Sequence, residues 1–217
     1  MKKLFALAFA ATMSFGASAQ LISSNTMTER ESNNYSRITF GYNSVNFNDA
    51  IDESMSGVSL EWTKGISVSA SLPLFIETGI GATYAWKSED DIDNRFLSIQ
   101  VPVNLVYKYQ LTDAINIAPF AGLYFRGNIL AESEYEDEYD SDKINWFDDF
   151  EDDGFGASRF SYGWQIGVGV EFKKFYLGLS YSSDLNKLID IDEEYDGESF
   201  KASSKTGTFA AKIGFNF

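Results

Sequence analysis

The chain has 217 residues, with 32 acidic and 17 basic side chains and a formal net charge of -15, which argues against nucleic acid as a partner. It contains neither cysteine nor histidine, so disulfides and thiol chemistry are excluded. Aromatic residues make up 16% of the chain, and 17 glycines accompany only 3 prolines, a composition that favours β-structure. After the first 19 residues no apolar run is long enough for a membrane-spanning helix, but transmembrane β-strands need no such run.

Residues 1–19 have the features of a cleaved signal peptide. Lys2 and Lys3 precede an apolar core, and Ala17-Ser18-Ala19 provides a small-residue cleavage site before Gln20. We predict export across an inner membrane. Residues 20–35 are polar and without periodicity, and we expect them to form a lead-in to the folded domain.

The first two alternating segments are residues 36–47 and 56–63, joined by a polar link. Alternation of apolar and polar residues predicts β-strands with one apolar face. The apolar faces consist of every second residue, namely Ile38, Phe40, Tyr42, Val58, Leu60 and Trp62.

Residues 74–86 and 96–109 repeat this pattern, with a charged link between them. Residues 115–129 follow a short turn, and their alternation is weaker because Phe120 and Tyr124 share a face with Arg126. Each proline in these strands lacks a donor for the hydrogen-bond ladder, so we expect bulges at Pro102 and Pro119.

The longest break in the alternation covers residues 130–158, and a second polar link covers 183–204. Between them, residues 160–172 alternate without exception, Lys173-Lys174 forms a turn, and residues 175–182 alternate again. Residues 205–217 form the last alternating segment.

Eight segments joined by alternately short and long links predict an all-β fold, an eight-stranded antiparallel up-and-down transmembrane β-barrel over residues 36–217. Such barrels place short turns and both termini on the periplasmic side, with long loops outside. Aromatic residues fall at both ends of the strands, as expected for interfacial belts: Tyr42, Tyr84, Trp86, Phe125, Phe160, Tyr162 and Tyr181 at the outer ends, and Tyr107, Tyr109, Phe172, Phe175, Phe215 and Phe217 at the inner ends. A soluble lipocalin-like barrel is the alternative, but it would leave these belts unexplained.

The charged residues of the strands identify the face that lines the lumen. A basic side chain in hydrocarbon costs about 2 to 4 kcal/mol near the midplane, so the charges should point inward. We expect a lumen charge network formed by Arg37, Glu61, Glu77, Lys108, Arg126, Glu171 and Lys212. Because an eight-stranded barrel is just wide enough for its own side chains, these residues predict a polar plug. Strand glycines should leave space for Phe120, Tyr124 and Tyr176.

Two short motifs carry a family resemblance. One strand runs Val101-Pro102-Val103 and ends in Lys108-Tyr109, and the next contains Ala118-Pro119-Phe120-Ala121-Gly122. In these features the chain resembles the outer-membrane β-barrel domain family of Gram-negative bacteria, in its PorT-like group. The resemblance implies a location in the outer membrane, among lipid and lipopolysaccharide. The terminal Phe217, with Phe215 in phase, resembles the signal read by the barrel-insertion machinery.

Function is less clearly indicated than fold. Outer-membrane barrel enzymes use histidine as general base, so we predict a protein that is not an enzyme and has no cofactor; a Ser-Lys or paired-carboxylate site is the alternative. The long loop carries a cluster of carboxylates: Glu136, Asp137, Glu138, Asp140, Asp142, Asp148, Asp149, Glu151, Asp152 and Asp153. It is either a solvated outer loop, a binding site for divalent cations that bridge to lipopolysaccharide phosphates, or a contact for an unknown protein partner.

The sequence therefore supports a closed barrel with a structural, adhesion or interaction role through loops 130–158 and 183–204. A narrow channel or carrier for small solutes is the alternative function.

Overall fold

The computed structural model describes residues 34–49, 53–69, 72–89, 92–137, 140–147, 155–195 and 198–217. The expected signal peptide and nearly all of the lead-in lie outside these residues. Residues 34–217 form one compact unit. Within the described residues, no helix has the length and apolar character needed to cross a membrane.

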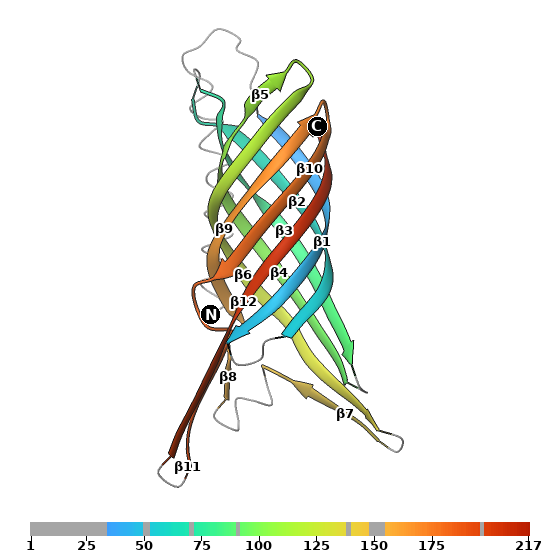
Figure 1. The fold of residues 1–217 in the computed structure, drawn as a ribbon, viewed down its shortest axis with the longest axis vertical. Coiled ribbons are helices and arrows are strands. Elements are labelled where there is room, and N and C mark those ends of the chain that lie inside the picture. Colours follow the sequence, from blue (N-terminus) through green and yellow to red (C-terminus); the bar gives the residue numbers. More distant parts are fainter. Residues whose placement is uncertain are drawn as a thin grey trace. The chain divides into compact units, whose positions relative to one another are not determined.

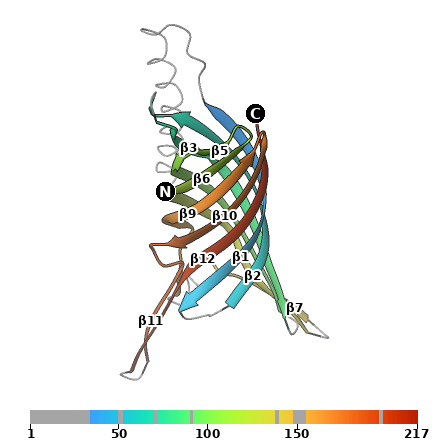
Figure 2. The ribbon, with the colours of Figure 1, turned by 45° about the horizontal axis from the view of Figure 1, so that its top comes forward.

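Eight long antiparallel strands close into a barrel, as the alternation predicts (Figure 1). Each pairs with the next one in the chain, and β1 pairs with β12 to close the ring. The strands are β1 (Tyr35–Asp49), β2 (Glu53–Ser67), β3 (Leu74–Glu89), β4 (Ile92–Tyr107), β6 (Ile115–Asp137), β9 (Phe160–Phe172), β10 (Phe175–Asp184) and β12 (Glu198–Asn216). Figure 2 shows them tilted around a common axis. The fold class is confirmed.

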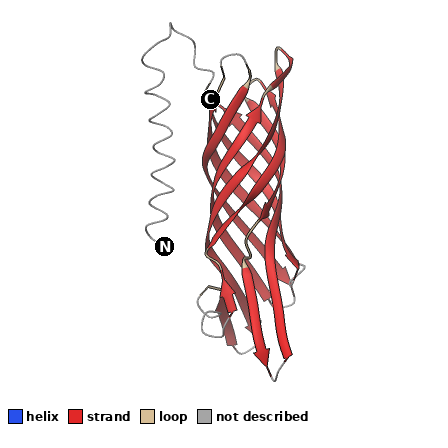
Figure 3. Ribbon diagram, turned by 90° about the vertical axis from the view of Figure 1, so that its left-hand side faces the viewer, coloured by secondary structure: helices blue, strands red, loops and turns tan. Residues whose placement is uncertain are grey.

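The two ends of the barrel differ. At one end, the turn end, lie the Lys173-Lys174 turn and Phe217, and the short strand β5 (Tyr109–Thr112) continues β4 there and pairs with β6. At the other, the loop end, β6 forms a hairpin with β7 (Asp140–Asn145), and β12 forms one with β11 (Ile189–Tyr195), which also pairs with β8 (Phe155–Ala157). These hairpins extend the sheet beyond the barrel (Figure 3).

Much of what was expected to be loop is therefore strand. Residues 130–137 continue β6, and the link 183–204 contains the end of β10, all of β11 and the start of β12. A strand outside hydrocarbon needs no apolar face, because backbone pairing alone satisfies its polar groups. The alternation that marks membrane strands is accordingly absent there. The fourth segment was placed too far along the chain, since β4 runs from Ile92 to Tyr107 and Tyr109 begins β5.

The β4–β6 ladder has its bulge at Ile129 and not at a proline. The β4–β6 register shifts between Leu97 and Ser98, which pair with Leu130 and Asn128, so Ile129 is the extra residue. The expected bulges at Pro102 and Pro119 are wrong, because Pro119 pairs with Val168 in unbroken register and the β4–β6 register is unbroken at Pro102. On the β3 side the ladder skips Pro102 without a change of register, which is how the strand accommodates the missing donor.

The predicted apolar faces point outward along the barrel. Phe40 and Leu177 are 53% and 60% exposed, whereas Arg37 on the opposite face of β1 is 4% exposed. The aromatic residues of both expected belts are exposed on this outer surface. The barrel thus has an apolar exterior and an interior that carries the charges.

Glycines of β9 make room for large interior rings. A Cβ on Gly163, Gly167 or Gly169 would lie within 2.5 Å of a ring atom of Tyr124, Phe120 or Tyr176, respectively. The strand-glycine expectation is correct for this strand. In β3 and β12, Gly79 and Gly214 lie instead against the backbone of neighbouring strands.

Candidate functional site

A cluster of buried charges fills the turn end of the lumen. Arg37 Nη1 lies 3.2 Å from Glu77 Oε2, and Arg37 Nη2 lies 2.7 Å from Glu171 Oε1. Lys108 Nζ approaches the same Glu171 oxygen at 2.8 Å. Arg37 Nε also donates to Asn216 Oδ1 at 2.8 Å. These contacts tie β1 to β3, β9 and β12 across the lumen.

Aromatic rings complete this layer. The Tyr35 hydroxyl donates to Glu77 Oε2 at 2.7 Å, and Lys108 Nζ lies 3.3 Å from the centre of the Tyr35 ring. The Arg37 guanidinium lies over the Tyr176 ring at 3.8 Å. Cation–π contacts of this kind gain strength where water is excluded. Opposite charges and ring faces therefore satisfy each other throughout the layer.

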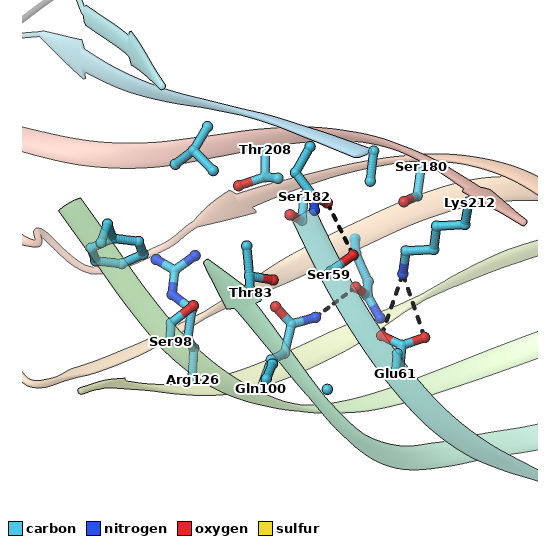
Figure 4. A pocket seen from close by; sticks show the side chains of 17 residues that line it. Ser59, Glu61, Thr83, Ser98, Gln100, Arg126, Ser180, Ser182, Thr208 and Lys212 are labelled. Carbon is cyan, nitrogen blue, oxygen red and sulfur yellow. Dashed lines mark hydrogen bonds and ion pairs between the residues drawn. The ribbon is translucent and has the colours of Figure 1, made fainter. Parts of the chain in front are cut away.

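The middle of the barrel contains a small polar cavity of about 40 Å³ (Figure 4). Lys212 Nζ lies 3.3 Å from Glu61 Oε2 at its wall. Gln100 Nε2 donates to Gln165 Oε1 at 3.2 Å. A volume of this size holds on the order of one to three water molecules. The buried Asn43 Nδ2 at the cavity wall has no partner among the described residues, so a cavity water would complete its hydrogen bonding.

A second buried ion pair lies between the cavity and the loop end. Arg126 Nη2 donates to Asp184 Oδ2 and to Thr206 Oγ1, and the Tyr124 hydroxyl donates to Asp184 Oδ1. Asn128 accepts from Arg126 Nε at 3.2 Å. The Asp184 side chain is completely buried, and Thr206 Oγ1 also donates to its Oδ2, so Arg126, Tyr124 and Thr206 together stabilise its charge.

Apolar side chains close the loop end of the lumen, and we call them the cap. The cap consists of Val45, Phe47, Met55, Ala85, Phe96, Ala131, Trp146, Phe147 and Leu188. Trp146 is held by two hydrogen bonds, from its backbone nitrogen to Ala131 O at 3.0 Å and from Nε1 to Ser133 Oγ at 2.9 Å. The Arg159 guanidinium lies 4.7 Å from the centre of the Phe147 ring. The segment after β7 therefore folds back into the barrel mouth.

Comparison with known protein families supports the barrel fold and its apolar exterior. The sequence pattern of the outer membrane protein beta-barrel domain matches residues 5–217. The chain belongs to this outer membrane β-barrel family. It is an outer-membrane β-barrel protein of the Gram-negative type. The alternative of a soluble lipocalin-like barrel is therefore excluded. The match does not separate the PorT-like group from the rest of the family.

Solved structures with a similar barrel are distant in sequence. Ail of Yersinia pestis, solved with the heparin analogue sucrose octasulfate, is 15% identical over 85% of this chain and 99% of its own, with a TM-score of 0.44. Neisserial surface protein A is 13% identical over 87% and 100%, with a TM-score of 0.49. The outer membrane enzyme PagL is 14% identical over 80% and 97%, with a TM-score of 0.42. No curated protein sequence matches the chain.

The outer-membrane barrel brings six of the seven expected lumen charges together, in two separate groups. Arg37, Glu77, Lys108 and Glu171 meet at the turn end, Glu61 and Lys212 pair at the cavity, and Arg126 lies apart from both groups. The partner of Arg126 is Asp184, which was not among the expected lumen charges. Its signal was present: Tyr176, Gly178 and Asp184 share the inward phase of β10, and extending that strand by two residues finds it.

The side chains of the expected acidic site lie outside the described residues. The backbone of Glu136 and Asp137 belongs to β6, and that of Asp140 and Asp142 to β7, whereas Glu138, Asp148, Asp149, Glu151, Asp152 and Asp153 are not described. Nearby described charges form pairs: Arg95 Nη1 lies 3.2 Å from Glu134 Oε2, and Lys143 Nζ lies 3.1 Å from Glu134 Oε1. Where side chains are described, no group of three acidic residues is arranged to hold a metal ion.

Proposed function

We propose that this outer-membrane protein is a closed, non-conducting barrel with a structural, adhesion or interaction role through its loop end. The supporting observation is the continuous filling of the lumen. The turn-end charge cluster, the Arg126–Asp184 pair and the cap follow one another along the axis, and the cavity among them has a volume of only about 40 Å³.

The lumen contains two charged layers, the turn-end charge cluster and the Arg126–Asp184 pair. The energy needed to disrupt them argues against a narrow channel or carrier. An ion crossing the barrel would have to separate Arg126 from Asp184 and Arg37 from its two carboxylates. Breaking one buried ion pair costs about 3 to 5 kcal/mol. A barrier that contains several such steps does not support steady conduction.

Single-channel recording in planar bilayers tests the closed barrel. We expect the refolded protein to show no steady openings over long recordings. A variant with Trp146→Ala and Phe147→Ala lacks two cap side chains but keeps both charged layers, and it should also be silent. Steady, ohmic openings of the unmodified protein would instead establish the channel.

The proposed contact surface is the pair of hairpins at the loop end. The sequence there is acidic, and several strand edges, including that of β7, have no neighbour among the described residues. Exposed edges and carboxylates together suit a basic, extended partner. Divalent cations that bridge the carboxylates to lipopolysaccharide phosphates are the other proposal for this surface.

Variants with shortened hairpins test the contact surface while leaving the barrel intact. Replacing residues 135–142 or 190–203 by Asn-Gly would close each hairpin with a two-residue turn. The register keeps Ser133 opposite Ile144 and Ile189 opposite Ser204, so the cap residues Trp146 and Leu188 stay in place. We expect cells carrying either variant to adhere less to a polylysine surface. Unchanged adhesion and unchanged calcium binding in titration calorimetry would contradict both proposals.

We also propose that the barrel is not an enzyme and uses no cofactor. The chain lacks histidine, and the buried carboxylates Glu77, Glu171 and Asp184 are each bound to cationic partners. A paired carboxylate makes a poor general base, because its charge is already stabilised. Phe215 and Phe217 are exposed at the end of the chain, and we retain the proposal that the insertion machinery reads them.

A further inference from the structure

A patch of two lysines and three phenylalanines surrounds the β9–β10 turn. The turn patch consists of Phe172, Lys173, Lys174, Phe175 and Phe215. All five side chains are exposed, and Phe175, at 64%, is the most exposed of the large apolar residues that the structure describes. The rings of Phe175 and Phe215 meet edge to face with their centres 5.9 Å apart. The patch is therefore an apolar surface with two cations at its rim.

The backbone fixes the position of both lysines. Lys173 N donates to Ala114 O at 3.0 Å, and Lys174 O accepts from Asn216 N at 2.7 Å. The turn is thus bound to the β5–β6 turn on one side and to the last strand on the other. The Lys173 ammonium lies 5.7 Å from the centre of the Phe172 ring, and that of Lys174 lies 5.7 Å from the centre of the Phe215 ring.

Within the part of the chain that the structure describes, no carboxylate neutralises these two ammonium groups. Among the described residues, neither Lys173 nor Lys174 forms an ion pair, in contrast to Lys108 and Lys212 inside the barrel. Asp113, an acid in the neighbouring turn, is exposed. Anionic groups in the surroundings of the barrel are therefore suitable counter-ions for both lysines.

At the position of the turn patch along the barrel axis, the surroundings are lipid headgroups. Exposed aromatic rings of a membrane barrel lie at the boundary between acyl chains and headgroups. Long basic side chains beside them keep their carbon stems on the apolar surface and extend their charge into the headgroup layer. Each lysine near an anionic membrane surface contributes about 1 kcal/mol of attraction.

We propose that the turn patch binds anionic phospholipid in the leaflet at the turn end of the barrel. The two ammonium groups contact the negatively charged headgroup, and the phenyl rings of Phe172 and Phe215 pack against the upper acyl chain. The site would give the barrel a shell of selected lipid on the side opposite its acidic hairpins. This inference is independent of the partner proposed for the loop end.

Spin-labelled lipids test the proposal directly. The protein is reconstituted in phosphatidylcholine vesicles that contain trace spin-labelled phosphatidylglycerol or phosphatidylcholine, and the motionally restricted fraction of each label is measured. We expect several-fold preference for phosphatidylglycerol at low salt. The double variant K173Q/K174Q should lose this preference, by up to about fivefold for each lysine. A folded barrel is verified first by its electrophoretic mobility without heating.

A matched control removes two lysines at the other end. Lys143 and Lys187 are exposed at the loop end, so K143Q/K187Q changes the net charge equally and should keep the preference. Raising the salt concentration to about 1 M, where the screening length falls to about 3 Å, should abolish it in the unmodified protein. Equal association of both lipids, equal effects of the two double variants, or a preference that survives high salt would each overturn the proposal.

Discussion

Burial distinguishes the lumen ion pairs from one another. The side chains of Arg126 and Asp184 are 5% and 0% exposed, whereas those of Lys212 and Glu61 are 17% and 15% exposed. Arg126 lines the cavity together with Lys212 and Glu61, but Asp184 does not. Water in the cavity can solvate a lone Glu61, but nothing comparable reaches Asp184. The same chemical change should therefore have different effects at the two sites.

We predict that Arg126→Ala lowers the free energy of unfolding by about 3 to 5 kcal/mol, because it leaves the Asp184 carboxylate buried without its cation. Lys212→Ala should cost clearly less. The measurement is urea unfolding in lipid vesicles, followed by tryptophan fluorescence. The double variant R126M/D184L, which removes both charges, should recover most of the loss; equal losses in R126A and K212A would contradict this account.

Gly169 is predicted to be intolerant of any side chain. A Cβ there would lie 2.2 Å from Cε2 of Tyr176, whose ring is fixed beneath Arg37. We expect Gly169→Ala to destabilise the barrel by about 1 to 3 kcal/mol through overpacking. Gly81→Ala is the matched control, since its Cβ would meet only the flexible Glu61 side chain at 3.2 Å. A neutral G169A variant in the same unfolding assay would show that the ring can move.

At the scale of elements, the bulge in β6 changes which residues face inward. Tyr124, Arg126 and Asn128 are buried before it, and Ala131 and Ser133 are buried after it. The inward-facing residues have even numbers before the bulge and odd numbers after it, because Ile129 is an extra residue between the two parts of the strand. The cap depends on this change, since Ala131 and Ser133 hold Trp146.

We predict that deletion of Ile129 is tolerated. The deletion removes the extra residue, restores a regular ladder, and leaves Ala131 and Ser133 facing inward. Its effect on the free energy of unfolding should stay within about 1 kcal/mol, the usual range for a change that touches no buried contact. Deletion of Leu123, in the regular part of the same strand, should prevent folding, because a one-residue slip turns each inward side chain beyond it toward lipid. Similar outcomes for both deletions would contradict the assigned bulge.

These elements show how far the sequence could be interpreted. Residues 160–172 were predicted to the residue, because that strand has its apolar face toward lipid and its polar face toward the lumen along its whole length, and the two alternate strictly. The bulge was misplaced, since Pro102 and Pro119 lack donors on one ladder only, whereas Ile129 has no unusual chemistry. The lumen charges could be assigned to a face from the strand phase, but their partners could not. Pairing depends on the stagger between strands, which alternation does not specify.

At the scale of the whole molecule, the orientation in the membrane is open to a direct measurement. The chain has no cysteine, so single cysteines can be introduced at Lys143 on the loop end and at Lys173 on the turn end. We predict that a membrane-impermeant maleimide labels only K143C on intact cells, because short turns of such barrels face the periplasm. Permeabilised cells should show labelling of both. Labelling of K173C alone on intact cells would show the opposite orientation, with the turn end facing outward.

The contacts of Arg37 have a consequence for the order of assembly. Arg37 belongs to the first strand, yet its partners Glu171 and Asn216 are 134 and 179 residues away along the chain. A growing barrel that had not yet received β12 would expose this guanidinium and an unpaired strand edge at the same open seam. Arrival of the last strand removes both penalties in one step. Arg37 thereby couples ring closure to the last strand, and a copy that ended before β12 would keep both the open seam and a guanidinium without its Asn216 partner.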